Sequence, residues 1–330
     1  MTPISIGKKT FKSNVFYAPL AGCSDYAYRQ MARRYSPPGL VFCEMVKMEA
    51  LVRADRNSFR LLDYSKDMHP IGAQLCGSNL NLVGQAARII EDLGFDLIDL
   101  NCGCPVDKVT RDGSGSGLLK NPNKIGDLLS KILATVSIPV TVKIRVGWDE
   151  QSIVAPLITK IAEQAGAQAI FIHGRTRVQA YKGPANWDYI KDCVKVANTI
   201  RVFGNGDVFS ADKALDLLEK TGCDGVLVSR GTFGQPWIAE DIHRMLSGLP
   251  PIERGFEFCK QALLDHFDII RRYAPEKKAI LDMRRVGCWY FKKGEVAKEF
   301  RKSISGVKTL DQVEAILHSL TNKTSSLIYS

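Results

Sequence analysis

Short apolar runs alternate with amphipathic stretches from about residue 15 to about residue 245. The runs are three to five residues long and rich in β-branched residues, which is typical of parallel strands buried on both faces. Strands that alternate with helices predict βα units and a parallel sheet. The eight expected strands are Val15–Ala18, Leu40–Glu44, Ile71–Leu75, Leu97–Leu100, Val140–Ile144, Ala169–Ile172, Arg201–Phe203 and Gly225–Val228.

The stretches between these strands carry apolar residues at helical spacing. Asn81–Leu93 stops before Gly94, a residue type common just after a helix, and Ser210 suits the N-cap of a helix over Ala211–Glu219. So many βα units favour an α/β fold closed into a (β/α)8 TIM barrel rather than an open sheet. Two further expected helices are Lys124–Val136 and Ser152–Ala165.

The pattern changes near Arg244. The segment SGLPPIERG is rich in proline and glycine and indicates a linker, and only helical patterns follow it. We therefore expect two domains, a catalytic barrel over residues 1–244 and a small all-helical domain over residues 245–330. An extended rim of the barrel is the alternative. The expected helices of this region are Phe256–Tyr273, Glu276–Lys292, Ala297–Ser303 and Leu310–Leu320.

Charge adds a candidate partner to this picture. The formal net charge is +10, and nine basic residues lie between Lys277 and Lys302 against three acidic ones. A basic segment of this kind suits a polyanion such as RNA, although basic proteins without such a partner exist. The chain contains no apolar run long enough to span a membrane and no apolar signal core near Met1. We expect a cytoplasmic protein.

The cysteines argue against a metal site. All nine are scattered, and no two have the C-x-x-C spacing of a zinc site; Cys102 and Cys104 are only one residue apart. Reduced thiols in a reducing compartment are the simplest interpretation, and we expect no metal.

Polar or ionisable residues end nearly every expected strand. The active site of a β/α barrel lies at the C-terminal ends of its strands, so these residues should converge on one mouth. Their convergence is a stronger indication of a site than any single motif. The strand ends carry APLAG (Ala18–Gly22), Glu44, Gln74, Asn101 with Cys104, Lys143 with Arg145, His173 with Arg175, GNGD (Gly204–Asp207) and Ser229–Gly231.

The last two strand ends resemble a phosphate site. Glycine lets backbone N–H groups approach an oxyanion, and the guanidinium of Arg230 can hold it. Two tight turns without a ligand are the alternative. Lys143 lies within an apolar strand, where a cation needs a partner. That partner is either a carboxylate or the electron-accepting ring of a cofactor.

Four more residues have candidate roles. The amides of Gln74 and Asn101 can bind the polar edge of a flavin or a pyrimidine, or they can cap loops. Cys104 precedes Pro105 at a strand mouth, and a thiol that is mostly protonated near neutral pH can act as a general acid. A buried inert thiol is the alternative for Cys104, and we assign Cys102 to packing. His173 is either a core histidine or part of the site.

Taken in order, these residues resemble the tRNA-dihydrouridine synthase family. The matching segments are APLAG, the Gln74 strand end, LNCGCP, VKIRVGW, IHGRTR, GNGDV and SRGTFGQPW, and the likeness continues more weakly through DMRRVGCWYF. Leu20 stands where the family usually has methionine, Ser229 where glycine is common, and Cys102 where methionine is frequent. None of these departures removes a group needed for the chemistry.

The resemblance implies reduction of the uracil C5–C6 double bond in tRNA, with FMN as cofactor and NADPH or NADH as reductant. It implies Cys104 as general acid and Asn101 as a substrate contact. We expect a monomer, with Arg145, Arg175, Lys277, Arg284, Arg285 and Lys292 also contacting the substrate. The implied FMN contacts are Pro19, Leu20, Ala21, Gln74, Lys143, His173, Asn205, Gly206, Asp207, Ser229 and Arg230.

Two other functions fit parts of the sequence. One is a flavin barrel that acts on a free small molecule, similar to dihydroorotate dehydrogenase, although such an enzyme does not need a basic helical tail. The other is an RNA-binding or folding factor on a barrel that has lost its catalytic function. A purified protein without flavin absorbance would favour the second.

Overall fold

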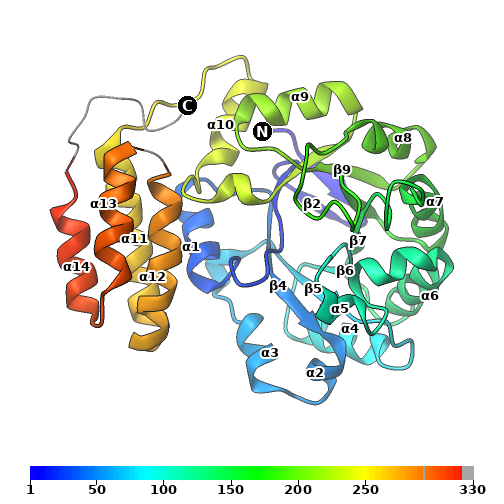
Figure 1. Ribbon diagram of the computed structural model, residues 1–330. Coiled ribbons are helices and arrows are strands. Elements are labelled where there is room, and N and C mark those ends of the chain that lie inside the picture. Colours follow the sequence, from blue (N-terminus) through cyan, green and yellow to red (C-terminus); the bar gives the residue numbers. More distant parts are fainter. Residues whose placement is uncertain (293, 322–330) are drawn as a thin grey trace.

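The computed structural model describes residues 1–292 and 294–321. Eight parallel strands close into a barrel in the order β10-β3-β4-β5-β6-β7-β8-β9, which confirms the expected TIM barrel (Figure 1). A short antiparallel hairpin, β1 (Ile4–Ile6) and β2 (Lys9–Phe11), precedes the barrel. The barrel strands are β3 (Val15–Tyr17), β4 (Leu40–Lys47), β5 (Ile71–Cys76), β6 (Leu97–Cys102), β7 (Val140–Arg145), β8 (Ala169–His173), β9 (Arg201–Asn205) and β10 (Gly225–Val228).

Helices follow the strands around the outside of the barrel. The side chain of Ser210 accepts a hydrogen bond from the Lys213 amide, so the expected N-cap is confirmed. Short 3-10 helices lie at Lys66–Met68, Gly115–Lys120 and Arg230–Thr232. The helices are α1 (Tyr26–Tyr35), α2 (Met48–Val52), α3 (Arg56–Leu61), α4 (Val83–Asp92), α5 (Asp107–Thr110), α6 (Pro122–Leu133), α7 (Ala155–Ala165), α8 (Asp188–Val196), α9 (Ala211–Thr221) and α10 (Ile238–Leu246).

The interior of the barrel changes from apolar to polar along its axis. At the N-terminal end, aromatic rings fill the barrel; the Phe16 and Phe203 ring centroids are 4.7 Å apart, and Phe171 and Phe203 are 5.0 Å apart. On β6, Leu97 belongs to this apolar layer. Side chains two residues apart share a face of a strand, so Asp99 and Asn101 follow Leu97 toward the mouth. The N-terminal end of the barrel is therefore a packed apolar layer, and the polar side chains gather at the C-terminal mouth.

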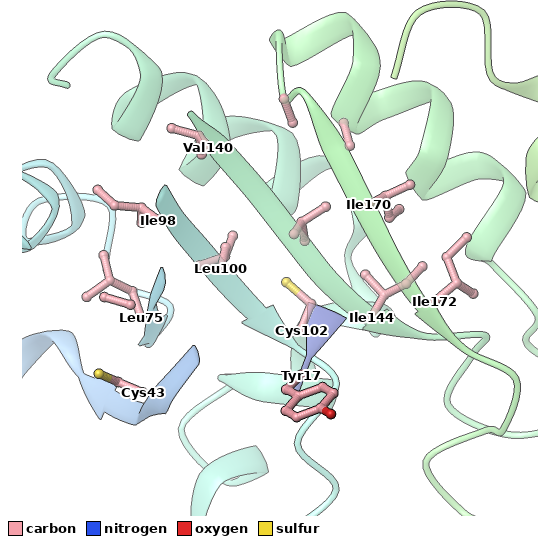
Figure 2. Packing of buried hydrophobic residues seen from close by; sticks show 14 of the residues in the cluster. Tyr17, Cys43, Leu75, Ile98, Leu100, Cys102, Val140, Ile144, Ile170 and Ile172 are labelled. Carbon is pink, nitrogen blue, oxygen red and sulfur yellow. The ribbon is translucent and has the colours of Figure 1, made fainter. Parts of the chain in front are cut away.

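The outward faces of the strands carry the apolar residues that pack against the helices. Figure 2 shows Ile98, Leu100 and Cys102 of β6 beside residues of β7 and β8 in this layer. Cys102 is fully buried there, as expected for a packing residue. Alternation along β6 thus sends Cys102 outward to the helices and its neighbour Asn101 inward.

Four helices after the linker pack on one flank of the barrel, beside α1 (Figure 1). Their apolar core also includes Ala27 and Met31 of α1 and Trp237, which precedes α10. Trp289 stacks on Phe233 with ring centroids 4.2 Å apart and ring planes at 4°. Residues 322–330 of the expected second domain lie outside the described residues. The helices are α11 (Phe256–Tyr273), α12 (Glu276–Tyr290), α13 (Gly294–Ser305) and α14 (Leu310–Ser319).

Among the described helices, none combines the length and apolar character needed to cross a membrane.

Candidate active site

A cavity of about 320 Å³ opens at the C-terminal mouth of the barrel, and every barrel strand or the loop after it contributes to its wall. All of the expected cofactor contacts line it, together with Cys104, Asn101 and Arg145. Five residues expected at the substrate do not line it: Arg175, Lys277, Arg284, Arg285 and Lys292.

Cys104 lies in the loop after β6, and hydrogen bonds hold its backbone on both sides. Its amide donates to Asn101 Oδ1 at 3.0 Å, and its carbonyl accepts from the Ser116 amide at 3.0 Å. Gly115 has φ +56°, and a Cβ there would lie 2.9 Å from the Cys104 carbonyl oxygen, so the close approach requires glycine. The half-buried thiol is thus held at the cavity wall.

Lys143 supplies a positive charge to the cavity from β7. Its ammonium lies 3.4 Å from Asn205 Oδ1, and no carboxylate of residues 1–292 or 294–321 lies within 4.0 Å of it. The ion pair considered from the sequence is therefore not formed within the part of the chain that the structure describes. Burial, and then the charge of Arg145, lowers the pKa of Lys143 to about 8.

Arg230 is a second cation at the mouth without a carboxylate partner within 4.0 Å in the described ranges. Its guanidinium carbon lies 4.7 Å from the ring centroid of Tyr181 and 5.4 Å from that of Phe209. Burial, with the charges of Lys143 and nearby arginines, lowers the pKa of His173 well below its usual range, so His173 is neutral. The cavity can accept an anion beside Arg230.

Comparisons with known proteins indicate the family to which this chain belongs. The family model described as dihydrouridine synthase matches residues 16–325. The chain belongs to the dihydrouridine synthase family. It is 36% identical over 304 residues to a probable tRNA-dihydrouridine synthase of Rickettsia bellii, covering 92% of this chain and 93% of that protein. It is 37% identical to tRNA-dihydrouridine synthase B of Pseudomonas syringae pv. tomato, covering 91% and 89%.

Solved structures share the fold of this dihydrouridine synthase at low sequence identity. Histamine dehydrogenase from Rhizobium sp. aligns with a TM-score of 0.57 and 14% identity, covering 81% of this chain and 50% of that one. A morphinone reductase mutant in complex with tetrahydroNAD aligns with a TM-score of 0.53 and 14% identity, covering 78% and 93%. These likenesses show the fold alone.

The two arginines at neighbouring strand ends of this dihydrouridine synthase have different surroundings. Arg145 lines the cavity and donates to the carbonyls of Gly103, Thr176 and Ala180 at 2.8 to 3.0 Å, which ties two loops together. Arg175 is buried, and its Nη2 lies 2.7 Å from each carboxylate oxygen of Asp207. The arrangement of Arg175 fits support of the loops better than contact with the substrate.

Asp207→Ala should lower the free energy of unfolding by about 3 kcal/mol, because Arg175 would stay buried without its counter-charge. Asp207 also accepts from the Ala185 amide at 2.7 Å, so the loop after β8 should loosen as well. Thermal or urea unfolding measures the change. Asp127→Ala, an exposed site on α6 without an ion pair in the described ranges, should change stability by less than about 0.5 kcal/mol.

Several cavity residues were not expected from the strand ends. Tyr181 lies well past β8 in its loop, and Met45 lies on β4 beyond the expected end of that strand at Glu44. Phe209 and Phe233 follow the two motifs GNGD and SRG closely. A search of whole loops for aromatic residues, rather than of strand ends for polar ones, would have found three of these four.

None of the four basic residues of the helical region lines the cavity, but Arg285 reaches its edge, where its Nη1 lies 3.6 Å from Sγ of the cavity residue Cys23. Arg284 donates to the Val307 carbonyl at 2.8 Å, and Arg285 lies 3.3 Å from both Asp25 and Asp282. Lys277 and Lys292 are exposed. In the described ranges, no group of three or more histidine, cysteine or acidic side chains could hold a metal ion.

Proposed function

We propose that this dihydrouridine synthase uses FMN and NADPH to reduce the C5–C6 double bond of uridine in tRNA. The observation that carries the proposal is one cavity that joins two cations without carboxylate partners in the described ranges, Lys143 and Arg230, with the half-buried thiol of Cys104. Relatives at 36% and 37% identity are named for this reaction on tRNA.

The residues present suit a flavin mononucleotide. Arg230 and Ser229 after β10, with Gly206 after β9, form the corner where this fold usually binds phosphate. Lys143 can stabilise negative charge on an electron-accepting ring, and Gln74 can bind its polar edge. A bound flavin would accept a hydride equivalent from the nicotinamide and deliver it to C6 of uracil.

Cys104 completes the reaction by giving its proton to C5. One uridine, one NADPH and one proton then become dihydrouridine and NADP⁺, and solvent returns a proton to the thiolate. Asn101 aligns the loop of Cys104 through its hydrogen bond to the Cys104 amide. A general acid held in this way contributes about 10²- to 10⁴-fold to a rate.

The helical region would hold the tRNA, with exposed Lys277 and Lys292 near its phosphates. The target uridine must leave its stack to enter the cavity. A monomer in the cytoplasm, where tRNA is found, is sufficient for this reaction.

Replacing both Lys277 and Lys292 with alanine should raise KM for tRNA with little change in kcat. If each lysine neutralises one phosphate, the slope of log affinity against log salt should become shallower by roughly 1 for each. Titrations of tRNA at several salt concentrations measure this. Lys160→Ala on α7, an exposed lysine on the barrel, is the matched control. An unchanged slope in the double variant would remove both lysines from the RNA contact.

Nucleoside mass spectrometry tests the proposed function directly. Bulk tRNA from cells without this gene is incubated with the purified protein, FMN and NADPH, and a nucleoside two hydrogens heavier than uridine should appear. A yellow protein that consumes NADPH but leaves the tRNA unchanged would instead indicate a flavin enzyme for a small substrate.

A further inference from the structure

Asp99 is a fully buried carboxyl group that the proposed reaction does not use. It lies on β6 inside the barrel, two residues before Asn101. In the strand register, Asp99 stands beside Gln74 of β5 on one side and Thr141 of β7 on the other. A buried carboxyl group is costly unless hydrogen bonds satisfy it, so its partners indicate its purpose.

A continuous chain of hydrogen bonds leads from Asp99 to the backbone of Cys104. Thr141 Oγ1 donates to Asp99 Oδ1 at 2.8 Å, and Gln74 Nε2 donates to Asp99 Oδ2 at 2.7 Å. Asn101 Nδ2 donates to Gln74 Oε1 at 2.8 Å. Asn101 Oδ1 then accepts from the amides of Gly103 at 3.2 Å and Cys104 at 3.0 Å.

The groups at the two ends of this hydrogen-bond chain determine how the side-chain amides of Gln74 and Asn101 are oriented. Backbone N–H groups only donate, so Asn101 must turn its oxygen toward Cys104 and its NH2 group toward Gln74. Gln74 must then turn its NH2 group away from Asn101, and it needs an acceptor there. A carboxylate is an acceptor at both oxygens, and Asp99 supplies it.

We infer that Asp99 is a positioning residue, which aligns Gln74 and Asn101 and through Asn101 holds the loop that carries the Cys104 thiol. Without an acceptor at position 99, the buried NH2 group of Gln74 loses its partner and competes for the oxygen of Asn101. Asn101 then turns away from the Cys104 amide. The inference rests on the proposed role of Cys104, although the alignment itself does not depend on the reaction.

The surroundings of Asp99 are consistent with this role. Burial raises the pKa of Asp99 to about 7, while the hydrogen bonds from Gln74 and Thr141 and the charge of Lys143 act in the opposite direction. A protonated carboxyl keeps one acceptor oxygen for Gln74 and can donate to the Thr141 hydroxyl. Both the ionised and the protonated carboxyl group of Asp99 therefore preserve the direction of the hydrogen bonds from Asp99 to Cys104.

The test compares Asp99→Leu, which removes the acceptor, with Asp99→Asn, which keeps an acceptor oxygen for Gln74 and removes the charge. The first readout is the rate at which iodoacetamide alkylates Cys104 in the purified protein, located by peptide mass spectrometry. Cys288 on α12, also half-buried, serves as the internal reference. The second readout is kcat and KM for dihydrouridine formation.

For Asp99→Leu we expect a change of more than threefold in Cys104 alkylation, no change at Cys288, and a loss of about 10- to 100-fold in kcat with KM for tRNA within about twofold. Asp99→Asn should stay within about threefold of the natural protein on every readout. Equal behaviour of the two variants, or a parallel change at Cys288, would overturn the inference.

If Asp99→Leu does not fold, Asp99→Thr replaces it, since its hydroxyl is one bond too short to reach Gln74, and the same results are expected. If the natural protein forms no dihydrouridine, the proposed function fails. The alkylation ratio of Cys104 to Cys288 still tests the alignment in that case.

Discussion

Cys104→Ala is expected to bind flavin normally and to lose about 10²- to 10⁴-fold in dihydrouridine formation, because the alanine variant has no proton to give to C5. The backbone of residue 104 keeps its hydrogen bonds to Asn101 and Ser116, so the cavity should retain its shape. Flavin absorbance and nucleoside mass spectrometry measure the two properties on the same sample.

Cys23 provides the discriminating comparison, because it is a second half-buried thiol at the wall of the same cavity. Cys23→Ala should keep turnover within about tenfold of the natural protein. A larger loss in Cys23→Ala than in Cys104→Ala would transfer the proton donor to Cys23. Full turnover in Cys104→Ala would exclude Cys104 from the reaction.

Lys143→Met should lower turnover by about 10²-fold, because the ammonium that Lys143 brings to the cavity wall would be lost while side-chain length is kept. The pH dependence gives a second signature. The pKa of Lys143 is lowered to about 8, so its charge is present below that pH and lost above it. Turnover of the natural protein should therefore fall as the pH rises through about 8.

NADPH consumption and dihydrouridine formation between pH 6 and pH 9.5 check this prediction. In NADPH consumption, which does not use the Cys104 proton, the fall near pH 8 should be absent from Lys143→Met. Lys143→Arg should retain part of the activity without that fall, since a guanidinium stays charged. An identical fall in Lys143→Met would assign the titration to another group. Lys160→Met on the outside of the barrel is the matched control.

The barrel could be predicted from the sequence because each buried strand is a short apolar run that a helix follows. The β1–β2 hairpin could not, since strands of three residues are too short to show alternation. The extension of β4 past Glu44 was also missed, because the strand shifts its register against β5 between Phe42 and Met45. Local pattern does not encode such an irregularity.

The sequence does not show which strand-end residues line the cavity, because this depends on interactions with residues that are distant in the sequence. Arg145 and Arg175 both end a strand motif, yet only Arg145 lines the cavity, because Asp207 holds Arg175. Asp99 gave no signal either, since it stands in an apolar run. Its importance emerges only from the register that sets it beside Gln74 and Thr141.

The C-terminal helices share their core with α1 and Trp237, and Trp289 stacks on Phe233 at the cavity wall. Chimeras between members of the family must respect this continuity. A chimera joined in the linker between α10 and α11 would combine the C-terminal helices of one protein with α1 of another. Ala27, Met31 and Trp237 would then be poorly covered. An exchange that moves α1, residues 233–237 and the C-terminal helices together would transplant a complete interface, and with it the angle at which RNA meets the mouth.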